Sequence, residues 1–412
     1  MIRPIAKSAA GLDVHKAVVV CTLIKEDSEG RIIKKTREFK TFHADLLSLS
    51  KWLKDEDAEI VAMESTGIYW KSIYEAIEDA GVKGFVVNAR HIKNVPGRKT
   101  DVQDSEWIAE LARCGLLKAS FIPPRDIRQL RLLTRYRRKI SGMLISEKNR
   151  LHKLLESMGI KLSCVVSSID GVSATKMIEA ILSREEPEKI ADHAVGRLKK
   201  KKEEIIRSIE GYHLSDRDHF LLKRVSGHIQ WIMGQLSELD TQIVMAMKPY
   251  EEQWKLLQTL PGVSNISAAI LLSEIGVDMG SFENSAHFCS WAGMCPGNNE
   301  SAGKRKSGKT RKGNTYLRTV MCEIANAAIK TKSQFKGKYN SLVLRRGHKR
   351  AVVAVGHLML KITYSMLKTG EPYKDPGIDY ESIVVERNAP RWIKVLKEYG
   401  YLKDEDIAVE TA

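Results

Sequence analysis

Residues 11–24, GLDVHKAVVVCTLI, and residues 31–42, RIIKKTREFKTF, decide the fold of the first part of the chain. Both runs are rich in β-branched residues, and the polar stretch EDSEG lies between them. Two such runs around a short polar turn predict a β-hairpin. Asp13 lies in the first run, although aspartate is depleted from strands and its carboxylate resists burial. A carboxylate at that position needs a partner.

The segments that follow alternate between helix and strand patterns. Residues 44–53 and 69–80 predict helices, and EIVAMES at 59–65 and VKGFVVN at 82–88 predict short buried strands. Antiparallel strands followed by alternating helix and strand are typical of an α/β domain with a mixed sheet. Glu64 ends the first buried strand, and α/β proteins build their sites at the carboxyl ends of sheet strands.

Residues 97–112, GRKTDVQDSEWIAELA, add two aspartates after a group of basic residues. Thr100 and Gln103 have the spacing of a capping box, which predicts the start of a helix at this point. Asp101 and Asp104 would then lie in its first turn and face the same way. Acids in a first turn also interact favourably with the helix dipole, so a structural role for the pair is an open alternative.

These acids together predict a metal site. Asp13, Glu64, Asp101 and Asp104 could meet at one end of the sheet, where four carboxylates would repel one another without cations. Oxygen ligands of this kind suit Mg²⁺ or Mn²⁺, and paired metals of that sort catalyse phosphodiester chemistry. His15 points to the same strand face as Asp13, and we expect a structural role for it ahead of a substrate contact.

Composition points to nucleic acid as a partner. The 412 residues contain 67 Lys and Arg against 51 Asp and Glu, a formal net charge of +16, which favours a polyanionic ligand. The six cysteines are scattered without a CxxC pair, which predicts a reduced cytoplasmic compartment and no cysteine metal site. No signal-peptide core is present at the N-terminus, and no apolar run approaches the roughly 18 residues of a membrane span. We therefore expect no membrane association.

Two long helical arms are predicted after Pro123 and Pro124. One face of the first carries Leu133, Ile140, Leu144, Leu151, Leu154 and Met158. In the second, apolar residues repeat every seven positions in two series: Leu222, Ile229, Leu236 and Ile243, and three residues later Val225, Ile232 and Leu239. This pattern predicts a coiled coil that associates copies of the chain, and a core helix of a bundle is the alternative.

Basic sequence characterises the last part of the chain. Residues 254–276 predict two helices joined by the turn LPGVS, which resembles a helix-hairpin-helix, although a plain αα-hairpin would look the same. Residues 296–318, PGNNESAGKRKSGKTRKGNTYLR, form a Gly- and Ser-rich loop. Its cations suit salt-sensitive contacts with a nucleic-acid backbone: Lys304, Arg305, Lys306, Lys309, Arg311 and Lys312. A disordered, solvated loop is the alternative. Helices over 316–331 and 351–368 and a polar tail follow.

Four stretches together resemble the DEDD transposases of the IS110 insertion-sequence family: GLDVHK, AMESTGIYW, NARHIKNVPGRKTDVQDSEWIAELARCGLL and the loop 296–318. The resemblance implies an N-terminal domain with the RNase H-like fold of RuvC-type resolvases. The metal-binding DEDD carboxylates of the family fall on Asp13, Glu64, Asp101 and Asp104. The resemblance also implies a serine nucleophile, which by its place before the Gly-Lys of ESAGK is Ser301, with Ser307 in reserve.

Members of this family move an insertion sequence under the guidance of a noncoding bridge RNA, and they assemble as oligomers. The resemblance therefore implies donor and target DNA, such an RNA, and further copies of the chain, in a dimer or tetramer, as partners on the nucleoid of a bacterial or archaeal cell. We predict a RuvC-like catalytic domain (1–126), a helical coiled-coil section (127–250), a mainly helical transposase domain (251–375) and a tail (376–412).

Two other functions stay open at this point. One is a junction-resolving nuclease that cuts through metal-activated water and uses the C-terminal region only for binding. The other is a non-enzymatic architectural protein that binds nucleic acid and needs the basic loop but not the carboxylates.

Overall fold

The computed structural model describes residues 4–402 apart from 66, 89–103, 213 and 298, and gives only the backbone of residues 299–301, 305, 306 and 381. Its internal contacts divide the chain into two units, Met1–Ile122 and Pro123–Ala412. Each unit has apolar cores of its own.

The first unit contains a five-stranded mixed sheet in the order β3-β2-β1-β4-β5. Its strands are β1 (Ser8–Val14), β2 (Val18–Glu26), β3 (Ile32–Lys40), β4 (Ile60–Glu64) and β5 (Gly84–Val87). β1, β2 and β3 pair antiparallel, whereas β1, β4 and β5 pair parallel. The predicted mixed sheet is therefore confirmed, with the two predicted buried strands as β4 and β5.

The predicted hairpin around EDSEG is confirmed, because β2 and β3 pair antiparallel on either side of it. Its first strand was predicted too long, because residues 11–24 contain two strands rather than one. β1 ends at Val14 and β2 begins at Val18, and the amide of His15 donates a 3.0 Å hydrogen bond to the carbonyl of Val18 across the turn. The sequence HKA of this turn contains none of the Gly, Pro, Asn or Asp residues that usually mark one. β1, β2 and β3 form a three-stranded meander.

Alternation along the strands sends side chains to two different helix layers. Even-numbered residues of β1 pack with α1 (His43–Asp55) and α2 (Trp70–Asp79) in one core. The opposite face of the sheet packs with α4 (Asp104–Arg113), through Ala9 and residues of β4 and β5. The helices predicted over 44–53 and 69–80 are confirmed as α1 and α2.

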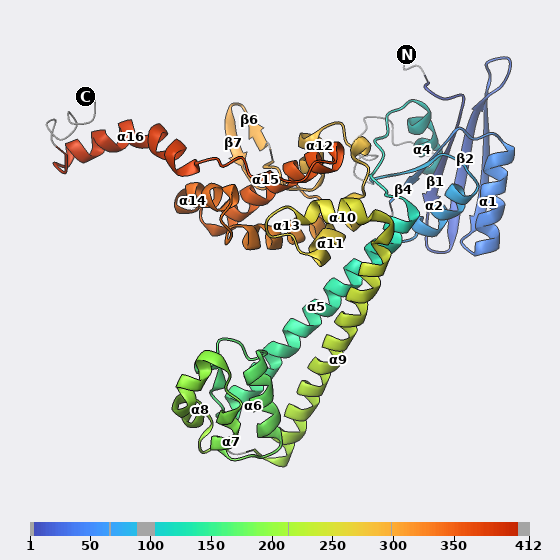
Figure 1. Cartoon of the computed structure of the whole chain (residues 1–412). Coiled ribbons are helices and arrows are strands. Elements are labelled where there is room, and N and C mark those ends of the chain that lie inside the picture. The colour runs from blue at the N-terminus through green and yellow to red at the C-terminus, as the bar shows by residue number, and fades with distance from the viewer. Residues whose placement is uncertain (1–3, 66, 89–103, 213, 298, 403–412) are drawn as a thin grey trace. The chain divides into compact units, whose positions relative to one another are not determined.

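The second unit begins with a long antiparallel pair of helices, α5 (Arg125–Ser157) and α9 (Asp216–Ala246), which lie side by side (Figure 1). Shorter helices close one end of the pair: η1 (Leu162–Cys164), α6 (Val172–Leu182), α7 (Pro187–Asp192), η2 (Gly196–Lys201) and α8 (Lys202–Ile209). The buried residues of α9 belong to the predicted heptads: Leu222, Val225, Ile229, Ile232 and Ile243. This apolar stripe is used within one chain, and coiled-coil association between chains stays a prediction.

The remainder of the second unit is a helical bundle with one small β-hairpin. The predicted helical hairpin is α10 (Glu251–Gln258) and α11 (Asn265–Ile275), which follows the short η3 (Lys248–Tyr250). The later elements are η4 (Met279–Ser281), α12 (Ser285–Trp291), β6 (Asn299–Ser301), β7 (Lys304–Ser307), α13 (Thr315–Ala328), α14 (Gln334–Arg346), α15 (His348–Thr369) and α16 (Tyr380–Glu398). The helices expected over 316–331 and 351–368 are α13 and α15.

The LPGVS turn between α10 and α11 packs against α13. Gly262 in this turn has φ +84°, and a Cβ on it would lie 2.7 Å from the amide nitrogen of Ala328. Only glycine permits both the positive φ and this close approach. The turn therefore contributes to packing of the bundle, which favours the plain αα-hairpin over a phosphate-binding module.

α15 is a core helix that also has the length and composition of a membrane span. An 18-residue window within it reaches a mean hydropathy of 1.2, which departs from the expectation that no segment approaches such a span. Half of that window is buried, and the helix packs against α12, α13 and α14. Its exposed residues include Lys349, Arg350 and Lys361, so one side of the helix is strongly basic.

Candidate functional site

Asp13 and Glu64 are neighbours at the carboxyl ends of β1 and β4. The parallel pairing of these strands ends with Leu12 and Met63, one residue before each acid. Strand residues two or four positions apart point to the same face, so Asp13 shares a face with Ala9, and Glu64 with Ala62. That face packs against α4. Both acids are half-buried, and neighbouring strands lie about 4.8 Å apart.

The first turn of α4 docks directly on β1 beside Asp13. A Cβ on Gly11 would lie 2.1 Å from the carbonyl oxygen of Ser105 and 2.3 Å from the amide nitrogen of Ala109. The hydroxyl of Ser105 is also 2.8 Å from that of Thr22, and this contact is buried. Because Asp104 precedes Ser105, the missing side chain at residue 11 lets the helix start close to the two strand carboxylates.

Two parts of the predicted site, the capping box with Asp101 and a cluster of metal ligands, are not found among the described residues. Asp101, Thr100 and Gln103 fall outside the described residues, so the capping box stays a prediction. Among the residues that are described, no three His, Cys, Asp or Glu side chains are close enough together to hold a metal ion. The neighbouring carboxylates Asp13 and Glu64 have the oxygen chemistry that Mg²⁺ or Mn²⁺ prefers, and in this respect the residues fit such an ion.

His15 contacts the same site. Its Nε2 lies 3.0 Å from Oδ2 of Asp13, and its side chain is 58% exposed whereas that of Asp13 is 23% exposed. An imidazole in this position orients the carboxylate by a hydrogen bond and still reaches solvent. The contact agrees with the expected structural role, and the exposed ring leaves the alternative of a substrate contact open.

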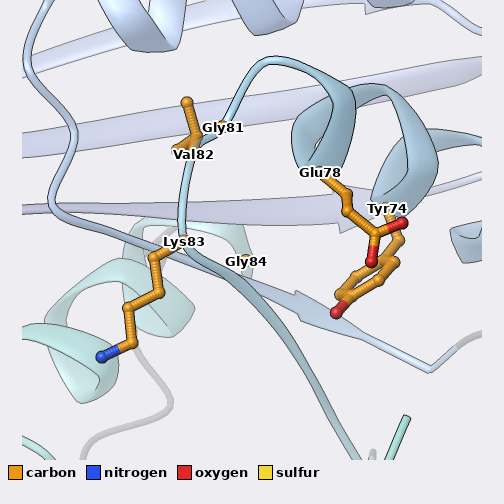
Figure 2. Close-up of a pocket in the computed structure, with 6 residues that line it drawn as sticks. All are labelled: Tyr74, Glu78, Gly81, Val82, Lys83 and Gly84. Carbon is orange, nitrogen blue, oxygen red and sulfur yellow. The ribbon is translucent and has the colours of Figure 1, made fainter. Parts of the chain in front are cut away.

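A small recess in the first unit lies away from these acids. It has a volume of about 310 Å³ and is lined by Tyr74, Glu78 and residues 81–84. Gly84 begins β5, whereas Glu64 pairs with Val87 at the other end of that strand. Figure 2 shows Tyr74 and Glu78 on α2 at one side of the recess, and the side chain of Lys83 directed away from them. The recess is thus at the amino ends of the parallel strands.

Ser301 ends the first strand of a β-hairpin. It pairs with Lys304 of β7, and only Ala302 and Gly303 lie between them. Both have positive φ, +50° and +72°, as a type I′ hairpin turn requires. The disordered-loop alternative for this region is therefore wrong, because residues 299–307 pair as strands and place Ser301 immediately before a tight turn.

Glycines anchor the base of this hairpin. A Cβ on Gly293 would lie 2.8 Å from the amide nitrogen of Gly313, so the backbones at the two ends of the loop are in direct contact. Pro296 and Thr310 form an isolated β-bridge, and the amide of Gly297 donates a 2.8 Å hydrogen bond to the carbonyl of Lys309. The hairpin consequently projects from a closed loop with a fixed base.

A basic cavity of about 1280 Å³ lies at the base of the hairpin, with walls from α13, α14 and α15. Of the six predicted nucleic-acid contacts only Lys309 lines it; Lys304, Arg311 and Lys312 are exposed elsewhere on the loop, and the side chains of Arg305 and Lys306 are outside the described set. The other cations in its wall were not among those contacts: Arg318, Lys338, Arg346, Lys349, Arg350 and Lys361. The signal that could have found half of them is the run RRGHKR at 345–350.

His357 lines the same cavity, and its surroundings favour the neutral form of its imidazole. Burial, assisted by the nearby Lys361, lowers the pKa of its imidazole below 6.5. Its Nε2 lies 3.6 Å from Sγ of Cys295, whose thiol pKa is raised chiefly by burial. All six cysteines are free thiols. Because the pKa of Cys295 is raised, its thiol stays protonated at neutral pH and acts as a packing residue.

We expect the protein to lose stability as the pH falls below 6.5, because the folded state binds a proton at His357 less readily than the unfolded chain does. His357→Asn should flatten this dependence between pH 7.5 and 5.5, measured as the midpoint of thermal unfolding. His43→Asn, which changes an exposed histidine, should leave the slope as in the wild type. Equal slopes for the wild type and His357→Asn would contradict the expectation.

Two transposase family models match the chain. The model for DEDD transposases of IS110 elements, described as "Transposase", matches residues 10–160. The model described as "Transposase IS116/IS110/IS902 family" matches residues 254–340. The first match covers the strand carboxylates and α4, and the second covers the hairpin with Ser301.

Curated relatives extend over most of the chain. The transposase for insertion sequence element IS1111A of Coxiella burnetii is 24% identical over 88% of this chain and 90% of its own length. A protein of Pseudomonas aeruginosa named "Probable family 20 transposase" is 23% identical over 77% of this chain and 86% of its own. The solved structure of Thermus thermophilus RuvC matches 27% of this chain and 99% of its own at 17% identity, with a TM-score of 0.21, too low to support a conclusion.

Proposed function

Because the chain belongs to the IS110 family of transposases, whose members cleave and transfer DNA strands, we propose that it recombines DNA through a carboxylate-held divalent metal and a serine nucleophile. One observation carries the proposal. Asp13 and Glu64 end neighbouring parallel strands on the face where α4 begins at Asp104. Acids placed side by side in this way require a cation or a proton.

Mg²⁺ or Mn²⁺ would be held by Asp13 and Glu64 and, by family resemblance, by Asp101 and Asp104. A divalent ion so held supplies positive charge that activates an attacking oxygen and stabilises charge on the scissile phosphate. The chain contributes the orientation of these ligands. His15 fixes one oxygen of Asp13 by its 3.0 Å contact, and the packing on Gly11 holds the start of α4 beside the strand ends.

Ser301 would attack the phosphorus of a DNA strand. Its Oγ forms an ester with the phosphate as one bond from phosphorus to a deoxyribose oxygen breaks, and the hydroxyl proton passes to a base. The bond energy is conserved in the phosphoserine link, so a sugar hydroxyl can later displace the serine and reseal the DNA. The hairpin supports this role, because Ser301 stands next to a two-residue turn and opposite Lys304.

We include a noncoding bridge RNA and an oligomer, a dimer or tetramer, in the proposal. Both follow from the family resemblance. The net charge of +16 supports a nucleic-acid partner in general, because Lys and Arg neutralise phosphates whatever the sugar. The exposed loop cations Lys304, Lys309, Arg311 and Lys312 support backbone contacts near the serine.

The proposal is tested by capturing the covalent intermediate. Purified protein is mixed with Mg²⁺, labelled donor and target DNA and the RNA transcribed from the DNA that flanks the gene, and is then denatured. We expect a protease-sensitive protein–DNA species. Ser301→Ala and Asp104→Asn should each lower its yield on the order of 10³-fold or more, because both groups act in the same step. Ser307→Ala tests the reserve serine on the partner strand, and the covalent species should persist in this variant if Ser301 is the nucleophile.

The alternatives give different results in the same assay. Cut DNA without a covalent species, and full activity of Ser301→Ala, would indicate a nuclease that uses metal-activated water. Bound but unreacted DNA that is insensitive to Asp104→Asn would indicate an architectural protein. Loss of the adduct in Ser307→Ala but not in Ser301→Ala would move the nucleophile to residue 307.

A further inference from the structure

The basic cavity beside the hairpin carries charge without compensation. Its wall contains seven Lys and Arg side chains and no aspartate or glutamate: Lys309, Arg318, Lys338, Arg346, Lys349, Arg350 and Lys361. None of the seven forms an ion pair with another residue that the structure describes. Cations gathered in this way repel one another, so a polyanion that enters the cavity relieves the repulsion.

The turn between α14 and α15 also favours an anion in this cavity. Gly347 ends α14 with φ +74°, and the exposed residues Lys349 and Arg350 fall in the first turn of α15. The amino end of a helix carries partial positive charge, and cations there are unfavourable unless an anion is bound. Arg346 adds a third cation from the last turn of α14.

Part of the remaining wall is apolar. Met294, Leu342, Val353 and Leu358 line the cavity together with Ala354. A ligand that fits must therefore present both phosphates and apolar surface. An unpaired strand has this character, since its bases are free to contact apolar side chains. In a duplex the bases are stacked inside and are not free to contact these apolar side chains.

We propose that this cavity binds one unpaired strand of nucleic acid, with its phosphates on Arg346, Lys349 and Arg350 and its bases over the apolar residues. The inference rests on the proposed function only for the class of ligand. A strand bound in this cavity would also lie close to Ser301, the proposed nucleophile. Ser307 lines the cavity and pairs with Asn299, which is two residues, or about 7 Å of strand, from Ser301.

The test compares two triple variants of the full chain that lose the same charge. The first is Arg346→Ala, Lys349→Ala and Arg350→Ala; the control is Arg197→Ala, Lys199→Ala and Lys200→Ala, all exposed residues near the far end of the α5–α9 pair. Binding of labelled single-stranded DNA, RNA of the same sequence and a duplex is measured as a function of salt, without cleavage. Thermal unfolding midpoints equal to that of the wild type establish that both variants fold.

For single strands we expect the first variant to bind at least tenfold more weakly at 0.1 M salt and to lower the slope of log K against log salt by about 2, since each lost phosphate contact removes about 0.7. The control should change binding less than threefold. A loss confined to RNA or to DNA supports the proposal and identifies the strand.

Equal losses in both triple variants would overturn the proposal in favour of diffuse attraction, and so would a larger loss for the duplex than for single strands. Because the assay needs no chemistry, its failure is distinct from a failure of Ser301 to form a covalent link. Leu342→Ser gives an independent measurement: it should weaken single-strand binding and leave duplex binding unchanged, and the reverse pattern would also overturn the proposal.

Discussion

Replacing Gly11 by alanine is expected to reduce strand cleavage by about 10²-fold, although residue 11 has no functional group. The added Cβ would lie 2.1 Å from the carbonyl oxygen of Ser105 and 2.3 Å from the amide nitrogen of Ala109. Both are backbone atoms that cannot rotate away, so α4 must move as a body. Its first residue, Asp104, would move with it, and a displacement of about 1 Å in a catalytic site can cost 10²-fold in rate. The overpacking should also cost about 1–3 kcal/mol of stability.

The measurement for this variant is the yield of covalent protein–DNA species, together with the midpoint of urea unfolding. Gly142→Ala is the matched control, because Gly142 lies within α5 and an added Cβ there meets nothing within 4 Å. Alanine in a helix interior should stabilise the protein by up to about 1 kcal/mol and leave cleavage unchanged. Wild-type cleavage and stability in Gly11→Ala would show that α4 is not held in place by this contact.

Glu274→Ala is expected to cost about 3–5 kcal/mol of unfolding free energy, because it removes the buried carboxylate that neutralises two partly buried arginines. Glu274 is 0% exposed and accepts two 2.8 Å hydrogen bonds from Arg135 and one of 2.6 Å from Asn314. Arg131 lies 3.5 Å from the same carboxylate, and burial lowers its pKa to about 10. Without the acid, the positive charges of Arg131 and Arg135 repel each other and have lost the carboxylate that they shared.

The same substitution should also reduce covalent product. Asn314 caps α13 by accepting from the amides of Tyr316 and Leu317, and it immediately follows the loop that carries the hairpin. The control is Glu323→Ala, because Glu323 is 62% exposed and its 3.6 Å pair with Arg138 should contribute less than about 1 kcal/mol. Similar urea midpoints for the two variants would refute the burial argument.

The sheet and its acids could be predicted from sequence because the signals are local. Glu64 ends an apolar run, and Asp13 is an exception within a β-branched one, so each stands out by itself. Their adjacency depends on the register of β1 with β4, which no local pattern contains. The break at His15–Ala17 was missed for a related reason, because sheet pairing rather than turn-forming residues makes that turn.

The cavity was missed because its cations come from separate elements. Lys309 follows the hairpin, Lys338 lies in α14 and Lys361 lies in α15, and only helix packing brings them to one wall. For α9 the buried face could be predicted from the heptads, but the helix that covers it could not. Their period predicts which face is buried, but a partner helix from the same chain and one from a second copy bury that face equally well.

The pairing of α9 with α5 has a thermodynamic consequence. Since the buried stripe of α9 packs against a helix of its own chain, formation of this part of the protein is a first-order process. The fraction of molecules in which this part is folded does not depend on protein concentration, whereas the folded fraction of an obligate dimer does. Dilution should therefore leave the α5–α9 pair folded. Any association of copies through this pair must use its outward faces, where residues such as Leu132, Tyr136 and Trp231 are exposed.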